Sequence, residues 1–160
     1  MLFRSGMGED SLLLAAAGYQ VFLYEVNPVI AALLKDSLRR ASQIPELKEI
    51  VSRMMVREED SIEALSRLDN PPDLILLDPM FPERKKSGLI KKKFQLLQKL
   101  ERPCSDERSL FEAAWKAEPK RLVIKRPLKG PCLAGKKPDY SIPGKAIRYD
   151  CFVNLRGRKM

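Results

Sequence analysis

The stretch Asp73-Leu74-Ile75-Leu76-Leu77-Asp78-Pro79-Met80-Phe81-Pro82 places an unbroken apolar run directly before an aspartate and a proline-rich turn. Short apolar runs bounded by turn signals are typical of strands buried on both faces of a sheet. Asn70-Pro71-Pro72 supplies the turn on the other side of the run. The sequence therefore predicts a buried strand over residues 73–78 that ends at the aspartate.

Strand and helix patterns alternate on both sides of this strand. Asn27 before Pro28 is typical of a helix N-cap followed by proline at the first helical position. Gly18 suits the position just after a helix end. Alternation of this kind predicts an α/β fold with a mostly parallel sheet covered on both faces. The predicted strands cover residues 20–25, 54–56, 73–78 and 121–126, and the predicted helices cover residues 9–17, 28–41, 45–53, 62–68 and 106–118.

Two further segments complete the predicted fold. Residues 84–102 are strongly basic and are expected to be mostly helical. Residues 139–155 alternate well enough for one or two terminal strands, which we expect to be antiparallel. Residues 1–160 are accordingly predicted to form a single domain, a size that one hydrophobic core can support.

Composition narrows the classes of function. The 30 Lys and Arg residues face 21 Asp and Glu, and the net charge of +9 favours a polyanion such as nucleic acid as partner. No apolar run approaches the roughly 18 residues of a membrane span, so no membrane partner is expected. The chain has no histidine, which excludes Ser-His-Asp and Cys-His catalysis. The cysteines form no Cys-x-x-Cys pair, which predicts a cytoplasmic protein without a metal site: Cys104, Cys132 and Cys151.

Ligands of parallel α/β sheets bind beyond the carboxyl ends of the strands. Gly6-Met7-Gly8 opens the first helix, where glycines allow close backbone approach and the helix presents free N–H groups. Glu9 and Asp10 follow at once. Their negative charges either stabilise the start of the helix or contact a cationic or hydroxyl-bearing cofactor. Acidic side chains here argue against a pyrophosphate and therefore against a nicotinamide dehydrogenase.

Acidic residues also follow the next two predicted strands. Glu25 ends the second strand, where a carboxylate can accept hydrogen bonds from both hydroxyls of a ribose. Asp60 and Ser61 follow the third strand and can cap the helix behind them. One of their side chains can at the same time meet an adenine amino group.

Asp78 to Pro82 is the sharpest chemical signal. Transfer of a methyl group from a sulfonium needs an amine placed in line with the methyl carbon. A carboxylate such as Asp78 that accepts the hydrogens of a base amine offsets the developing positive charge. Pro79 fixes the backbone, and Phe81 can stack on an extruded base. We therefore predict Asp78, Pro79 and Phe81 as the catalytic segment of a methyltransferase that acts on a base amine.

The basic segment that follows the catalytic segment is predicted to contact RNA phosphates. Between residues 84 and 102 the only acidic residue is Glu101. Arg126, with Lys125, and the tail after residue 155 extend this basic surface. Trp115 and Tyr149 are predicted to pack in the core. The basic residues of the segment are Arg84, Lys85, Lys86, Lys91, Lys92, Lys93, Lys99 and Arg102.

The motifs together resemble the ribosomal RNA small subunit methyltransferase J family. The resemblance rests on Gly6–Asp10, Tyr24–Val29, Leu77–Pro82 with Lys85-Lys86-Ser87, and Val123–Pro127. It implies a class I methyltransferase fold, S-adenosylmethionine as cofactor, and the N2 amine of a guanine in 16S ribosomal RNA as acceptor. It also implies contacts with the cofactor from Glu9, Asp10, Glu25, Val26, Asp60, Ser61 and Asp78, beside the glycines Gly6 and Gly8.

The chain departs from that family at two places. Met1 to Ser5 stand where the family has an acidic residue and an alanine, and the family carries a preceding segment that is absent here. We therefore expect the first strand to be missing or incomplete. Val26 stands where the family often has arginine. Two alternatives remain: methylation of an adenine or cytosine amine, and a non-catalytic RNA-binding fragment. The sequence makes no prediction of oligomeric state.

Overall fold

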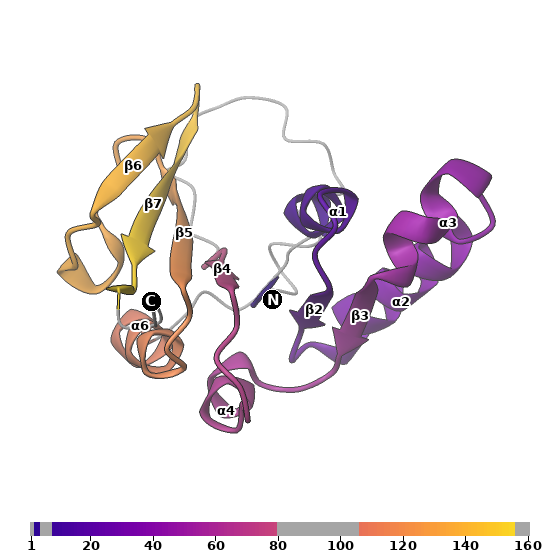
Figure 1. Ribbon diagram of the computed structural model, residues 1–160, viewed down its shortest axis with the longest axis horizontal. Coiled ribbons are helices and arrows are strands. Elements are labelled where there is room, and N and C mark those ends of the chain that lie inside the picture. Colours follow the sequence, from indigo (N-terminus) through magenta and orange to yellow (C-terminus); the bar gives the residue numbers. More distant parts are fainter. Residues whose placement is uncertain (1, 4–7, 80–105, 156–160) are drawn as a thin grey trace.

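The computed structural model describes residues 2–3, 8–79 and 106–155, which form a twisted sheet with helices on both faces (Figure 1). The strands lie in the order β3-β2-β1-β4-β5-β7-β6. They are β1 (Leu2–Phe3), β2 (Val21–Tyr24), β3 (Met54–Arg57), β4 (Leu74–Leu77), β5 (Arg121–Pro127), β6 (Tyr140–Pro143) and β7 (Ile147–Val153). The helices are α1 (Glu9–Ala16), α2 (Pro28–Ala41), α3 (Pro45–Ser52), α4 (Ser61–Ser66) and α6 (Glu107–Lys116), with a short 3₁₀ turn η1 at Leu133–Gly135.

Strands β1 to β5 are mutually parallel, and β7 and β6 are antiparallel to their neighbours. This arrangement confirms the predicted mostly parallel sheet with antiparallel terminal strands. β1 takes the central place, where Phe3 pairs with Tyr24 of β2 and with Leu77 of β4. Among the described residues β1 has two residues, whereas β2 and β4 have four each. The first strand is therefore present but short.

Side-chain oxygens cap the start of α2, α4 and α6, and the caps of α2 and α4 are those predicted from the sequence. The Oδ1 atom of Asn27 accepts the N–H groups of Val29 at 3.0 Å and Ile30 at 3.4 Å, and Pro28 follows at the first helical position. Asp106 caps α6 by accepting the N–H of Ser109 at 2.8 Å. Because a side-chain oxygen replaces the missing intrahelical acceptor, each of these capped helices begins at a defined residue.

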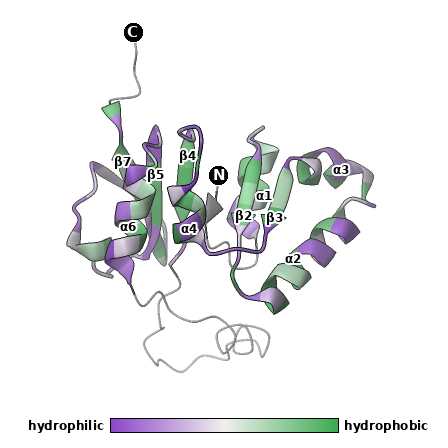
Figure 2. Cartoon of the chain, turned by 90° about the horizontal axis from the view of Figure 1, so that it is seen from below, coloured by the Kyte–Doolittle hydropathy of each residue, from purple (hydrophilic) through white to green (hydrophobic). Residues whose placement is uncertain are grey.

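The two faces of the sheet carry different helices. Figure 1 shows α4 and α6 on one face and α1 on the other. Ile75, Leu77 and Leu122 face α4 and α6 in the larger apolar cluster. Val21 and Leu23 pack in the smaller cluster with Ala15 of α1. Figure 2 shows the central strands as mostly hydrophobic, whereas the far half of α2 is hydrophilic.

Trp115 is only partly in the core. Its side chain is 37% exposed, and its ring lies 6.3 Å from that of Phe152 in an edge-on arrangement. Phe111 completes this aromatic group with its ring centre 5.2 Å from that of Phe152. The group fixes α6 against β7. None of the helices in the described ranges is long and apolar enough to cross a membrane.

Candidate functional site

Acidic residues follow four parallel strands at one edge of the sheet. Asp10 lies in the first turn of α1, the helix that follows β1. Glu25 comes directly after β2, Asp60 after β3 and Asp78 directly after β4. Because the strands are parallel, their carboxyl ends lie along the same edge. The fold thus gathers at that edge acids that are up to 68 residues apart in the sequence.

Gly8 forms the turn into α1. Its φ of 79° and ψ of 8° are left-handed, a conformation that glycine adopts without steric cost. A Cβ atom at this position would lie 3.4 Å from Leu34 and 3.9 Å from Leu23. The first-turn N–H groups of α1 therefore face the edge of the sheet with Glu9 and Asp10 beside them.

Glu25 is held in place at the end of β2. Its side chain is buried with 7% exposure, and its Oε1 atom accepts the backbone N–H of Asn27 at 2.7 Å. Val26, the next residue, is 56% exposed. The structure therefore places a fixed carboxylate beside an accessible apolar side chain.

Asp60 caps α4 as the sequence predicts. Its Oδ1 atom accepts the N–H of Ile62 at 2.8 Å and that of Glu63 at 3.2 Å. Ser61 is 5% exposed and begins the helix one residue earlier than predicted. Both of these hydrogen bonds use Oδ1 of Asp60, so the same side chain can cap the helix and contact a ligand through its other oxygen.

A four-residue network surrounds Asp78. The Nζ atom of Lys125 donates to Asp10 Oδ2 at 2.8 Å and to Asp78 Oδ2 at 3.1 Å. The hydroxyl of Tyr149 donates to Asp10 Oδ1 at 3.1 Å. Lys125 and Tyr149 are direct partners in the ladder between β5 and β7. The four side chains come from four elements and meet at the carboxyl end of β4.

Burial and charge act in opposite directions on the two ends of the Lys125–Asp78 contact. Burial raises the pKa of Asp78, while the charge and hydrogen bond of Lys125 act to lower that pKa. Burial acts to lower the pKa of Lys125, but Asp10 and Asp78 outweigh it and raise that pKa above its ordinary value. Lys125 is therefore a fixed cation at any physiological pH.

The sequence predicts that Lys125 extends the basic surface, whereas its ammonium group lies inside this network. Tyr149 is predicted to pack in the core, and it does pack against the smaller apolar cluster while its hydroxyl reaches Asp10. Both are partly buried, and both bond to Asp10. The signal for Lys125 was its position at the end of a parallel strand, where ligands of such sheets bind.

Arg126 corrects a prediction. It is 1% exposed, so it is not available to RNA phosphates. Its Nε atom donates to the carbonyl of Pro131 at 2.7 Å, and its guanidinium pairs with Glu107 at 3.2 Å. Arg126 points to the face covered by α6, on the side of the buried Leu122 and Ile124. It is a structural residue that ties α6 and the following loop to β5.

Pro79 is buried directly after Asp78, as expected of a residue that fixes the backbone there. The remaining predicted site residues lie outside the described ranges, and their roles stay predictions. They are Gly6, Phe81, Arg84, Lys85, Lys86, Lys91, Lys92 and Lys93.

The fold and the edge acids define a class of protein. A sheet of order β3-β2-β1-β4-β5-β7-β6 with antiparallel β7 is that of the class I S-adenosylmethionine-dependent methyltransferases. Residues 4–154 match the family described as putative SAM-dependent methyltransferase, and the chain belongs to that family.

Named relatives agree with this assignment. The chain is 41% identical over 149 residues to the ribosomal RNA small subunit methyltransferase J of Pseudomonas fluorescens, covering 92% of this chain and 57% of that protein. It is 42% identical to the protein of that name from Dechloromonas aromatica, with 92% and 61% covered. The chain thus spans about three fifths of the length of these relatives.

A solved structure carries the same fold. The crystal structure of a SAM-dependent methyltransferase from Neisseria gonorrhoeae superposes with a TM-score of 0.75. The two chains are 30% identical, and the match covers 99% of this chain and 67% of that one. The similarity extends over all elements described above.

The edge residues fit S-adenosylmethionine by their chemistry. The cofactor carries a sulfonium and an ammonium cation, and the described edge offers acidic side chains at four strand ends. Its carboxylate matches the free N–H groups at the start of α1. The hydroxyl of Ser11 in that first turn is buried and has no hydrogen-bond partner among the described residues. Glu25, Val26 and Asp60 would line the ribose and adenine end, and Asp10 and Asp78 the methionine end.

We expect Gly8→Ala to weaken cofactor binding beyond its cost in stability. An L-residue in the left-handed conformation costs about 1–2 kcal/mol, and relief of that strain would move the start of α1. Gly18→Ala is the matched control, because Gly18 has a φ of 96° at the opposite end of α1. Urea denaturation should show similar losses for both variants. Calorimetric titration with S-adenosylhomocysteine should show weaker binding for Gly8→Ala alone, and equal affinities would contradict the assignment.

Proposed function

We propose that this chain transfers a methyl group from S-adenosylmethionine to the N2 amine of a guanine in 16S ribosomal RNA. The observation that carries the proposal is the position of Asp78: it ends β4 at the carboxyl edge, with one oxygen held by Lys125. The names of the relatives support ribosomal RNA as the substrate. We propose residues 1–160 as a single catalytic unit that acts in the cytoplasm.

The chemistry asks three things of the protein. S-adenosylmethionine, when bound, supplies a methyl group on a positively charged sulfur. Asp78 accepts a hydrogen of the guanine amine, which turns the nitrogen lone pair toward the methyl carbon and offsets the positive charge that develops on nitrogen. The nitrogen–carbon bond forms as the carbon–sulfur bond breaks, and Asp78 is the acceptor for the proton that nitrogen then loses. Pro79 keeps the carboxylate at the strand end.

The remaining edge residues hold the cofactor rather than react. Glu25 accepts hydrogen bonds from the ribose hydroxyls. Its carboxylate suits this role because the 2.7 Å hydrogen bond from the backbone N–H of Asn27 to Oε1 fixes its orientation. Val26 packs against the adenine plane, and Asp60 meets the adenine amino group. These contacts place the methyl group near Asp78, so most of the rate enhancement comes from alignment.

The charge distribution supports an RNA partner on one half of the molecule. Residues 8–79 contain 7 Lys and Arg against 13 Asp and Glu, whereas residues 106–155 contain 11 against 6. On α2 and α3 several of the cations are paired locally, as in the contacts of Arg40 with Asp36 and of Arg53 with Glu49. Among the residues that the structure describes, the positive excess therefore lies on the side of β5, β7 and β6, where we propose that RNA approaches.

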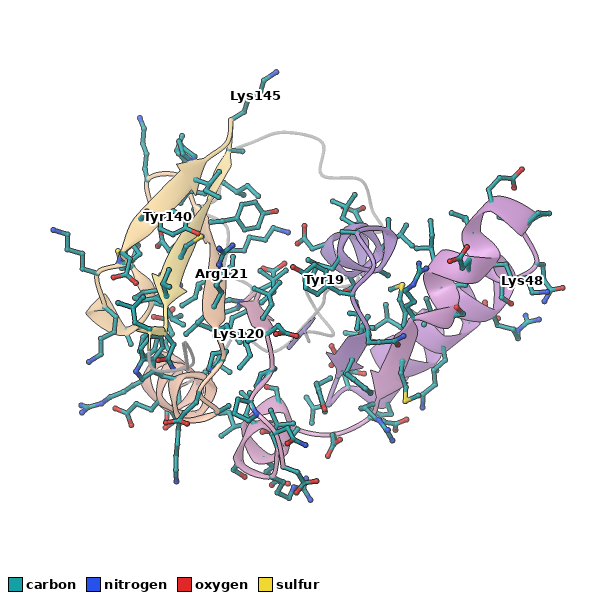
Figure 3. All side chains as sticks on the ribbon, viewed as in Figure 1. Tyr19, Lys48, Lys120, Arg121, Tyr140 and Lys145 are labelled. Carbon is teal, nitrogen blue, oxygen red and sulfur yellow. The ribbon has the colours of Figure 1, made fainter. Side chains whose placement is uncertain are left out.

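Two exposed lysines of this half stand at the carboxyl edge. Lys129 follows the end of β5, and Lys145 lies in the turn between β6 and β7. Figure 3 shows Lys145 projecting from the tip of that hairpin, whereas Lys48 lies on α3 at the far side. Lys129 and Lys145 are thus placed to contact phosphates beside the site.

We expect the double variant Lys129→Gln/Lys145→Gln to bind RNA more weakly, with the slope of log affinity against log salt reduced by about 2. Each lost phosphate contact removes about one released counterion. Lys48→Gln is the control and should leave affinity and slope unchanged. Filter binding at several salt concentrations measures both. An unchanged slope in the double variant would place the RNA elsewhere.

Methylation of 16S ribosomal RNA with methyl-labelled S-adenosylmethionine tests the function. After digestion to nucleosides, mass analysis should find the label in N2-methylguanosine. Label in a modified adenosine or cytidine would instead assign the first alternative. Absence of transfer by a folded chain that does not bind S-adenosylhomocysteine would favour a non-catalytic RNA-binding role.

A further inference from the structure

We propose that Lys125 is a positioning residue: it clamps Asp10 and Asp78 together, so that Asp78 turns its second oxygen toward the acceptor amine. This inference rests on the proposed function, in which Asp78 accepts a hydrogen of that amine. Lys125 acts through Asp78 and does not itself react.

The geometry of the clamp is specific. A single ammonium group bonds to Oδ2 of Asp10 at 2.8 Å and to Oδ2 of Asp78 at 3.1 Å. The side chains of Lys125, Asp10 and Asp78 are 26%, 20% and 19% exposed, so solvent screens the contacts less than at the surface. Two carboxylates held this close without a cation would repel each other. Lys125 therefore joins the start of α1 to the end of β4.

Tyr149 fixes the other side of Asp10. Its hydroxyl donates to Oδ1 of Asp10, so both oxygens of that carboxylate are engaged by strands β5 and β7. Asp10 consequently cannot rotate toward Asp78 without losing a bond. The clamp thereby reserves Asp78 as the carboxylate that meets the acceptor.

Lys125 also favours the ionised form of Asp78, although burial keeps the pKa of that carboxyl above its ordinary value. Within the described ranges, the charged and titratable groups around Asp78 come from three other elements: Asp10 on α1, Lys125 on β5 and Tyr149 on β7. Burial and the charge of Asp10 raise the pKa of Asp78, and Lys125 alone among these groups lowers it. Catalysis needs the ionised form, so activity is present above this pKa and is lost as pH falls through it. Removing the cation should move that loss to higher pH.

The test compares Lys125→Met, which keeps the chain length and removes the charge, with Lys125→Arg, which keeps the charge. Lys120→Met is the matched control at the opposite end of β5, where Lys120 pairs with the exposed Asp73. We expect Lys125→Met to lower kcat about tenfold or more at neutral pH and to shift the acidic limb of the kcat profile up by about one pH unit or more. Lys125→Arg should restore the limb, and Lys120→Met should not move it.

A second readout separates this inference from the proposed function. Carbon-13 NMR of the carboxyl groups follows the titration of Asp78 in the full chain without any turnover. Asp78 should titrate at higher pH in Lys125→Met than in the wild-type chain. Identical titrations would overturn the inference even in an active enzyme. Failure of the wild-type chain to methylate RNA would overturn the proposed function, and the carboxyl titration would still decide whether Lys125 controls Asp78.

Discussion

We expect Asp78→Asn to lower kcat for methyl transfer about 100- to 1,000-fold, the magnitude typical for loss of one electrostatic contact to a transition state. Asparagine keeps the shape of the side chain but removes the negative charge that offsets the charge on the acceptor nitrogen. It also cannot take the proton that nitrogen loses. Single-turnover transfer to RNA measures the effect, because it separates chemistry from product release.

The control for Asp78→Asn lies on the same strand. Asp73 stands before the amino end of β4 and is exposed, so Asp73→Asn removes the same charge far from the site. It should keep the wild-type rate constant. Equal rate constants for wild type and Asp78→Asn would contradict the role of Asp78, provided that both chains unfold at similar urea concentrations.

We expect Arg126→Met to lower the free energy of unfolding by about 2–4 kcal/mol. The substitution leaves the carbonyl of Pro131 without its 2.7 Å donor and Glu107 without its buried cation. A buried polar group left without its partner lowers the free energy of unfolding by more than a surface ion pair contributes to it. Urea denaturation followed by circular dichroism measures the loss.

Arg121→Met is the matched control for Arg126→Met. Arg121 begins the same strand and is exposed, so its replacement should change stability by no more than about 0.5 kcal/mol. In the absence of urea, Arg126→Met should bind RNA with the same slope of log affinity against log salt as the wild type. A stable Arg126→Met with a reduced salt slope would restore Arg126 as an RNA contact.

The helices and strands were well predicted because the caps and apolar runs that define them lie within a few residues of each element. Asn27 and Pro28 define the start of α2 through bonds to residues two and three positions away. The apolar run before Asp78 becomes β4, since a strand covered on both faces needs no alternation. Glu25 and Asp78 fall at strand ends for the same reason, because each directly follows a recognisable strand.

The clamp was not predicted because it joins distant parts of the chain. Lys125 and Asp10 are 115 residues apart, and Tyr149 and Asp10 are 139 apart. Only the sheet order brings them together, with β1 beside β4 and β5 beside β7. The net charge of the sequence counts Lys125 as one more surface cation, although its ammonium group pairs with Asp10 and Asp78 inside the site.

One signal in β5 could have separated the two neighbouring cations. Successive side chains of a strand point to opposite faces. Arg126 therefore lies on the face of Leu122 and Ile124, which pack against α6, and Lys125 on the face of Val123, which packs near α1. Applying that period of two to the strand predicts a buried Arg126 and a Lys125 directed toward the start of α1.

The most direct test of the central claim is an amide NMR titration of the chain with S-adenosylhomocysteine. We predict that the largest shift changes fall on Gly8 to Asp10, Glu25, Val26, Asp60 and Asp78, along the carboxyl edge. Asp73 and Lys120, at the opposite edge, should not move. Changes confined to other surfaces, or none at saturating ligand, would contradict the account that this edge holds the methyl donor beside Asp78.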